Sequence, residues 1–377
     1  MSASSDFSGM QSEDLQALQS SKYLNPSLID FLEQLQSFEY IPEISGVADL
    51  MDFHVSTVWK LMKVLRQKGL LLQGLVDVAR LGMVEVVLIF DALLEPHEVP
   101  KCLLREYAPL LPWGTYLRYV VPRELVEPFL NSLYMRLNAE AREVYIMPVT
   151  IHSKPSLKEY YDVNSRRLHV EWGDLVTRVK TSSRESLPRE VQAERLKYDE
   201  IDLYLIRELE LNPFSSIKSI ARKLNEELYP GKNINYVLVL RHYNNHVRER
   251  DVMKGVRLKL EQILLDSPVK TLSVLAGNPV DLLRVARVLT THPYFLDAYL
   301  NISDNILLTQ ALVPQRSLFS LSLFLERLKR EGLAKSWRCL YLDNTRAKRY
   351  AFPVRLYSLT LDRLLDSSDE ELLVREI

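Results

Sequence analysis

Residue types that mark secreted, zinc-knuckle or nucleotide-binding proteins are scarce in this sequence of 377 residues. Its two cysteines, Cys102 and Cys339, lie far apart and form no Cys-x-x-Cys, which excludes a disulfide framework and a zinc knuckle. Its 11 glycines form no phosphate-cradling loop. No apolar run reaches the roughly 18 residues of a membrane span, and residues 1–16 lack a signal-peptide core. We therefore expect a cytoplasmic protein that does not enter a membrane.

The sequence has no excess of positive or negative charge, because its 48 basic and 49 acidic residues leave a formal net charge of -1. Any attraction to nucleic acid must therefore come from local clusters of charge. The length suits two or more domains, and 47% apolar with 26% charged residues is typical of a globular protein.

Residues 55–68 predict an amphipathic helix. Its apolar positions, at the i, i+3, i+4, i+7 spacing of one buried face, are Val58, Leu61, Met62 and Leu65. Ser56 and Thr57 are candidate caps, and Gly69 is a natural end. The exposed face of this helix would carry hydroxyls first and cations after them.

Two further helices are predicted upstream, at 26–38 and 44–51, which gives a helix-turn-helix arrangement. Residues 70–82 are short, apolar and interrupted by glycine, as a β-wing would be. The alternative is an ordinary three-helix core with a solvated charged face.

The second half repeats this pattern. Ile217, Ile220, Ala221 and Leu224 correspond to Ile44, Val47, Ala48 and Met51 at an offset of 173 residues. Val239, Tyr243 and His246 correspond to Val58, Met62 and Leu65 at an offset of 181. Between Lys218 and Lys259 there are ten basic and four acidic residues, a cluster suited to phosphate contacts. We infer an internal repeat.

Strands and helices alternate after each helical unit. The first series is a strand at 84–91, a helix at 98–108, a strand at 113–121, a helix at 124–137 and a strand at 142–151. The second is a strand at 270–277, a helix at 279–289, a hairpin at 295–313, a helix at 316–332 and a strand at 335–343. This order favours the ferredoxin-like βαββαβ unit.

The sequence resembles the Lrp/AsnC (feast/famine) transcription regulators, in a tandem-duplicated form. The residues that carry the resemblance are Ile44, Val47, Ala48, Val55-Ser56-Thr57-Val58, Gly69-Leu70-Leu71, Val76-Asp77 and Leu81-Gly82. The resemblance implies DNA binding by each winged unit and pairing of the ferredoxin-like units through their sheets. The fold class that we predict is α+β, with two winged helix-turn-helix domains and two ferredoxin-like domains in tandem.

Two positions depart from that family. Leu61 stands where the family usually has arginine, and Leu117 replaces the acid that follows Gly114-Thr115-Tyr116 in members that bind amino acids. We therefore expect no amino-acid effector.

Residues early in a recognition helix contact base edges, and neighbouring cations contact phosphates. The DNA-binding candidates of the first unit are Ser56, Thr57, Trp59, Lys60, Lys63 and Arg66. Those of the second unit are Lys232, Asn235, Arg241, His242, Asn245, Arg248 and Arg250. Trp59 has the alternative of packing against the neighbouring helix.

Candidates for catalysis or metal binding are few. His242 and His246 have an i, i+4 spacing that can bind a metal, but no third ligand is evident, and His246 falls on the predicted buried face. Neither cysteine has a histidine close in sequence. We predict no catalytic residues, no metal, no cofactor and no chemistry of the chain's own.

The predicted function is transcription regulation by occupancy of a promoter or operator, with double-stranded DNA as partner. Self-association through the ferredoxin-like domains, within one chain or between two, is expected, and transcription machinery is a further candidate partner. The expected location is the nucleoid. One alternative is an architectural, chromatin-like protein that bridges DNA. Another is an enzyme like the sirohaem decarboxylases, although their Arg-rich signature is absent at residues 70–82.

The predicted boundaries are 1–23 for a disordered acidic amino terminus, 24–78 and 198–262 for the winged units, 79–155 and 263–357 for the ferredoxin-like units, 156–197 for a linker and 358–377 for an acidic tail. Within the linker, Leu168, Val170 and Trp172 alternate with polar residues, which is consistent with a strand.

Overall fold

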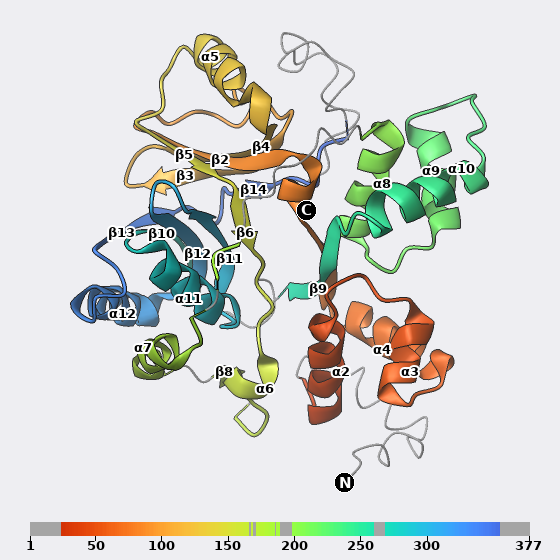
Figure 1. Ribbon diagram of the computed structural model, residues 1–377, viewed down its shortest axis with the longest axis horizontal. Helices are drawn as coiled ribbons and strands as arrows, with labels where there is room; N and C mark the ends of the chain where they lie inside the picture. Colours follow the sequence, from red (N-terminus) through yellow and green to blue (C-terminus); the bar gives the residue numbers. More distant parts are fainter. Residues whose placement is uncertain are drawn as a thin grey trace.

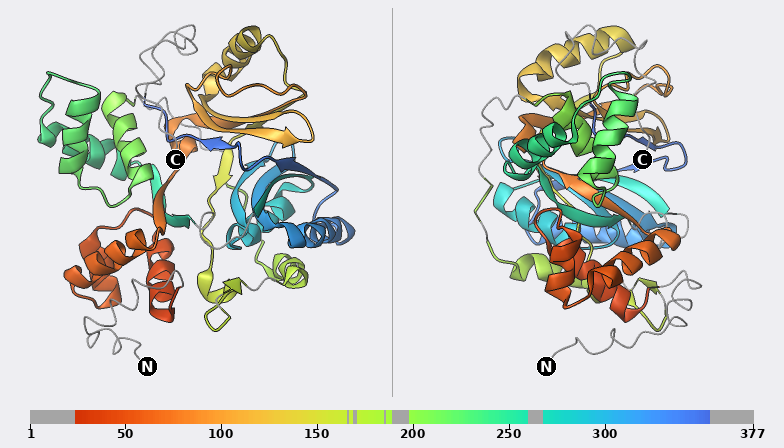
Figure 2. Two further views of the ribbon diagram at one scale, coloured as in Figure 1. Left: turned by 180° about the vertical axis from the view of Figure 1, so that it is seen from behind. Right: turned by 90° about the vertical axis from the view of Figure 1, so that its right-hand side faces the viewer.

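The chain is a mixed α+β protein with antiparallel sheets in the computed structural model, in agreement with the predicted class (Figure 1). The structure describes residues 24–165, 167–168, 171–184, 186–188, 198–259 and 268–354. Two helical units lie on one side of the molecule, and a large sheet with its own helices lies on the other (Figures 1 and 2). The terminal segments predicted at 1–23 and 358–377 lie outside the described residues.

The first helical unit, residues 24–76, contains α2 (Pro26–Ser37), α3 (Ile44–Met51), α4 (Val55–Gln67) and β1 (Leu71–Val76), and is followed by the short helix η2 (Val78–Leu81). The predicted apolar face of α4 is buried, with Val58, Leu61, Met62 and Leu65 each at most 3% exposed. Its N-cap is His54, whose Nδ1 accepts the Ser56 N–H, so the helix begins before the predicted caps at Ser56 and Thr57.

The second helical unit, residues 198–259, contains α8 (Glu200–Leu211), α9 (Ile217–Glu227), α10 (Tyr236–His242), the π-helical turn η4 (Tyr243–Arg248) and β9 (Met253–Lys259). Val239 is buried as predicted. Tyr243 and His246 are only half-buried, and Val247 takes the buried position instead. The cause is the π-helical turn, whose wider winding shifts the buried face by one residue.

The strands that follow the two helical units pair with each other. β1 and β9 form an antiparallel ribbon in which Leu71 lies opposite Lys259 and Gly74 opposite Val256. A Cβ at Gly74 would lie 2.5 Å from the Leu209 carbonyl oxygen, so glycine is required for α8 to approach the ribbon. The β-wing predicted at 70–82 is therefore wrong, because β1 finds its partner in the other half.

The large sheet has ten strands, in the order β5-β2-β4-β3-β13-β10-β12-β11-β6, with β14 paired to β3. Its first half consists of β2 (Met83–Phe90), β3 (Leu104–Leu111), β4 (Thr115–Pro122) and β5 (Glu143–Met147). Its second half consists of β10 (Pro268–Ala276), β11 (Phe295–Asn301), β12 (Ile306–Pro314) and β13 (Ser336–Leu342). The remaining strands are β6 (Val149–Ile151) and β14 (Lys348–Arg349).

The two end strands of the sheet are consecutive in the chain. β5 pairs with β2 at one end of the order and β6 pairs with β11 at the other, although only Pro148 separates β5 from β6 in the chain. The halves also meet where β3 pairs with β13. A shared apolar core with residues from both halves, including Val87, Tyr116, Leu272 and Leu308, fills the space between them.

The two halves of the sheet differ in their helices. The second half has α11 (Pro279–Thr290) and α12 (Leu318–Arg330), preceded by η5 (Gln315–Ser317), and is a complete βαββαβ unit. The first half has only α5 (Val126–Leu137), preceded by η3 (Arg123–Leu125). The helix predicted at 98–108 does not form, since Leu103 has a positive φ of 63° and β3 begins at Leu104. Pro109 in β3 is likewise incompatible with a helix interior.

The segment predicted as a linker contains α6 (Leu157–Tyr160), β7 (Tyr161–Asp162), β8 (Arg167–Leu168) and α7 (Trp172–Thr181). Leu168 is in a strand, Val170 lies outside the described residues, and Trp172 begins α7, so the predicted strand ends earlier than expected. Trp172 packs 5.9 Å from Phe324 between ring centroids, which holds α7 against α12.

Each helical unit packs across the molecule. Leu258 of β9 lies in the apolar core of the first helical unit, and Gln36 of α2 accepts the Leu258 N–H at 3.2 Å. The core of the second helical unit is continuous with that of the first sheet half, where Leu205 and Val121 belong to one cluster. Among the described residues, no helix is long and apolar enough to cross a membrane.

Candidate functional site

Most of the DNA-binding candidates on α4 face solvent. Ser56, Trp59, Lys60, Lys63 and Arg66 are exposed, and Thr57 is half-buried. The Ser56 hydroxyl lies 2.7 Å from His54 Nδ1, and the Arg66 guanidinium donates to Asn212 Oδ1 at 3.1 Å, at the end of α8. The outer face of α4 therefore presents two lysines, a hydroxyl and a half-exposed indole.

The candidates of the second unit are divided. Lys232, Asn235, Arg241, Asn245 and Arg248 are exposed. Asn235 caps α10 by accepting the Val237 N–H at 2.9 Å. The first turn of α10 is apolar and exposed through Tyr236, Val237 and Leu238, unlike the cationic face of α4.

Two candidates of the second unit are turned inward. The guanidinium of Arg250 lies 5.5 Å from the ring centroid of Tyr198, and the Arg250 residue is half-buried. The His242 side chain is 14% exposed and bonds Asp202. The His242 imidazole is therefore engaged by a carboxylate, whereas Arg250 Nη1 is buried without a hydrogen-bond partner among the described residues.

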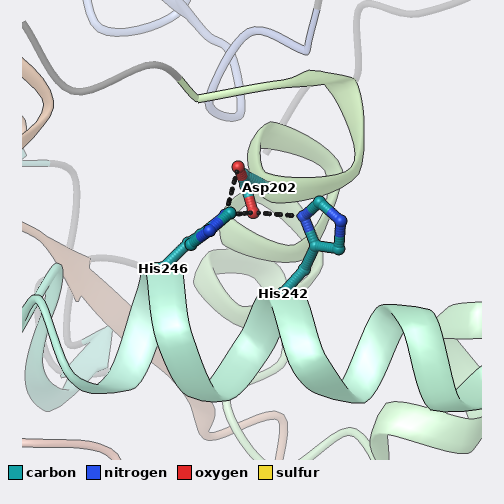
Figure 3. Close-up of side chains that lie close together, drawn as sticks. All are labelled: Asp202, His242 and His246. Atoms are coloured by element: carbon teal, nitrogen blue, oxygen red, sulfur yellow. Dashed lines mark hydrogen bonds and ion pairs between the residues drawn. The ribbon is translucent and has the colours of Figure 1, made fainter.

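His242 and His246 meet at Asp202, as Figure 3 shows. Nδ1 of each histidine lies 2.9 Å from Asp202 Oδ1, and His246 Nδ1 lies 3.0 Å from Oδ2. Asp202 belongs to α8, is fully buried, and also accepts the Asp199 N–H at 3.1 Å. The three side chains offer ligand atoms within 4.8 Å of one another. Sequence spacing could not reveal this third residue, which lies 40 positions from His242.

The hydrogen bonds in this cluster favour the charged forms of both Asp202 and His242. Burial by itself would raise the pKa of Asp202, but the hydrogen bonds from His242, the Asp199 backbone and His246 hold that pKa below its usual range. The hydrogen bond to Asp202 raises the pKa of His242. Asp202 is therefore ionised at neutral pH.

A second group of charges lines a cavity of about 80 Å³ where the β1–β9 ribbon meets the large sheet. Its cations are Arg105, Arg118, Arg257, Lys259 and Arg349, and its acids are Glu85, Glu210 and Asp297. His152 and Thr150 also line it. None of these residues was predicted from the sequence.

Ion pairs in this cavity join the second helical unit to both halves of the sheet. Arg105 of β3 makes a bidentate pair with Glu210 of α8, which also accepts the Phe352 N–H at 2.7 Å. Arg257 of β9 donates to Asp297 of β11 at 2.7 Å. Burial would raise the pKa of Asp297, but Arg257 and His152 hold it well below its usual range.

Deeper between the sheet halves, Glu106 is fully buried and is contacted by several donors. It pairs with Lys270, accepts from Arg118 Nε at 3.4 Å and from Arg349 Nε at 3.3 Å, and accepts from Gln310 at 3.0 Å. Two buried atoms on the cavity wall, Arg105 Nε and Thr150 Oγ1, have no hydrogen-bond partner within the described residues, whereas His152 Nδ1 lies 3.5 Å from Asp297 Oδ1. The cavity can therefore still donate to an anionic group.

Comparison with known proteins gives few matches. No protein-family model and no curated protein matches the chain. Two crystal structures of the siroheme decarboxylase NirDL, one with an iron-uroporphyrin III analogue, cover 84% of this chain and 91% of their own at 12% identity and a TM-score of 0.45. A structure of PH0061 covers 33% of this chain and 90% of its own at 13% identity and a TM-score of 0.22.

These comparisons correct one expectation. The first two structures are of an enzyme, which runs against the expectation that the chain carries out no chemistry. They match the enzyme alternative that the sequence had favoured less than DNA binding.

Proposed function

We propose that the chain binds double-stranded DNA through its helical units and regulates transcription by occupying promoter or operator sites. The observation that carries this proposal is the outer face of α4, where Lys60 and Lys63 are exposed and form no ion pair within the described residues. Cations placed in this way on the third helix of such a unit suit phosphate contacts beside a groove.

The arrangement of the two units supports the proposal. The β1–β9 ribbon pairs equivalent strands of the two halves antiparallel, which is the relation that a two-fold arrangement requires. Both helical units lie on the side of the molecule away from the large sheet (Figure 1). Two such units suit paired half-sites in DNA. The apolar first turn of α10 makes us expect the first unit to contribute most of the electrostatic attraction.

Replacing Lys60 and Lys63 together by alanine is expected to weaken binding to all DNA fragments and to reduce the salt slope by about 1.8, or 0.9 for each lost phosphate contact. Fluorescence anisotropy across a salt series, with genomic and random fragments, would measure both effects. The matched control is Lys329→Ala with Lys335→Ala, two exposed lysines at and beyond the end of α12. Equal losses in the two variants would count against α4, and no DNA binding by the unmodified chain would end the proposal.

A second candidate function is catalysis on an organic acid in the central cavity. The unpartnered Arg105 Nε and Thr150 Oγ1 on a cation-rich wall favour it. When a carboxylate leaves as carbon dioxide, the electron pair left on carbon must take up a proton. His152 lies 3.5 Å from Asp297 Oδ1, and that carboxylate would orient it as the proton donor. The cavity of about 80 Å³ would hold one acid group, since whole drug-sized ligands need about 300 Å³ or more.

Siroheme is the substrate to try first, because the solved siroheme decarboxylase acts on it. We expect carbon dioxide release from siroheme under anaerobic conditions, and at least about a tenfold loss of rate in His152→Gln if His152 supplies the proton. His97→Gln, at an exposed position, is the control. Absence of carbon dioxide release by the unmodified chain would reject siroheme decarboxylation, and an unchanged rate in His152→Gln would remove His152 from the mechanism.

A further inference from the structure

The Asp202, His242 and His246 cluster is built from three separate turns of the second helical unit. Asp202 projects from the first turn of α8, His242 ends α10, and His246 belongs to the π-helical turn η4. Both imidazoles direct Nδ1 toward the same buried carboxylate (Figure 3). Isolated π-helical turns occur frequently at functional sites.

The distances are close to those of a metal site. A tetrahedral zinc ion with ligand bonds of about 2.0–2.2 Å separates neighbouring ligand atoms by roughly 3.3 Å. The Nδ1 to carboxylate distances here are 2.9–3.0 Å, so each histidine needs to move from Asp202 by only a few tenths of an ångström, and all three ligand atoms already lie within 4.8 Å of one another. Rotation of two side chains that are 14% and 30% exposed can provide this opening.

We propose that Asp202, His242 and His246 bind a divalent transition-metal ion of the zinc class through one carboxylate oxygen and the two Nδ1 atoms. Two imidazoles and a carboxylate suit zinc, cobalt or nickel, whereas calcium and magnesium prefer oxygen ligands alone. Three protein ligands leave a fourth position open to water or to a ligand, and His246, at 30% exposure, leaves that side accessible.

The charges around the cluster favour a cation. Asp202 is ionised, and Asp199 Oδ1 lies 3.5 Å from His242 Nδ1 and adds a second carboxylate nearby. The positive charge of Arg241 acts against a bound cation, as it also acts to lower the pKa of His242. Metal binding would release the protons that the histidines now share with Asp202. The ion would also tie α8 to the end of α10, which fixes the orientation of the second helical unit's outermost helix.

The test uses the full chain, freed of metal with a chelator and titrated with Co²⁺ at pH 7.5 in the absence of DNA. We expect the visible absorption of cobalt bound to nitrogen and oxygen ligands, saturating at one ion per chain and displaced by Zn²⁺. His246→Ala is expected to weaken binding on the order of 100-fold, because it removes a ligand and leaves the buried Asp202 bonded to His242. His97→Ala, at an exposed histidine, should bind as the unmodified chain does.

A second readout guards against misfolding. Zn²⁺ should raise the melting temperature of the unmodified chain and of His97→Ala but not that of His246→Ala, whose melting without metal shows that it is folded. No saturable binding by the unmodified chain, or equal binding by His246→Ala, would overturn the proposal. The cluster would then serve only to hold α8 against α10 and η4 through hydrogen bonds. Because DNA is absent, the result is independent of whether the chain binds DNA.

Discussion

Replacing Arg105 by alanine is expected to lower the free energy of unfolding by about 3–5 kcal/mol, because it leaves Glu210 as an uncompensated buried charge. The Glu210 side chain is 3% exposed and is paired with Arg105 through both carboxylate oxygens. Burial by itself would raise the pKa of Glu210, but Arg105 and the Phe352 N–H hold it below its usual range. Without Arg105, Glu210 must take up a proton or draw water into the cavity.

Urea denaturation followed by circular dichroism would measure this loss. Arg105→Met with Glu210→Leu removes both charges and is expected to recover most of the stability, since an apolar pair of similar volume often replaces a buried ion pair without loss. Arg330→Ala, at an exposed pair with Glu326, should cost far less stability, because solvent screens that pair. A loss in Arg105→Ala as small as that in Arg330→Ala would show that the pair does not hold β3 to α8.

His292→Phe is expected to make the protein less sensitive to mild acid. His292 is fully buried among aromatic rings, with Tyr160 at 4.7 Å and Phe295 at 5.6 Å between ring centroids, and its Nδ1 accepts the Tyr294 N–H at 3.1 Å. Burial, with a smaller effect of Arg178, lowers its pKa from 6.5 to about 3. The folded protein therefore keeps this imidazole neutral while the unfolded chain protonates it.

The direction in which stability changes with pH depends on whether the folded or the unfolded state binds the proton more tightly. Because the folded pKa is the lower one, the unfolded state binds more protons between pH 6.5 and 3, and stability falls as pH falls through that window. From pH 7 to pH 5 this single group removes about 2 kcal/mol from the stability of the unmodified chain. His292→Phe should lack that contribution. Urea denaturation of both proteins at each pH would measure it as the difference between their free energies of unfolding. His97→Phe, at an exposed position, should keep it. Parallel stability curves for His292→Phe and the unmodified chain would contradict the expected titration.

Local patterns predicted the helices well, and their limits have physical causes. The stripe Val58, Leu61, Met62 and Leu65 was correct because burial of one face follows from helical spacing alone. The helix expected at 98–108 failed because Leu104 to Leu111 lie in a central strand buried on both faces, where alternation of polar and apolar residues is lost. The β-wing failed because the partner of β1 lies at least 177 residues away, which is the separation between Val76 and its partner Met253.

The candidate sites were harder to predict than the helices. His242 and His246 were recognised as a pair from their spacing, but Asp202 joins them only through the packing of α8 on α10. The charges of the central cavity come from β2, β3, β4, β9, β11, β14 and α8, and no single one of these elements indicates a shared site in the sequence. Buried charged residues within otherwise apolar strands, such as Arg105 and Glu106 in β3, were the one signal available.

Pairing between strands far apart in the chain has a consequence for how this chain is made on the ribosome. β6 is complete once Ile151 is synthesised, but its partner β11 ends at Asn301, 150 residues later. At about 5–20 residues per second, β6 waits roughly 8–30 s for its partner. β1 is also synthesised long before its partner, since β9 begins only at Met253. The first half of the nascent chain thus displays unpaired strand edges for seconds, a state that favours aggregation and gives chaperones time to bind.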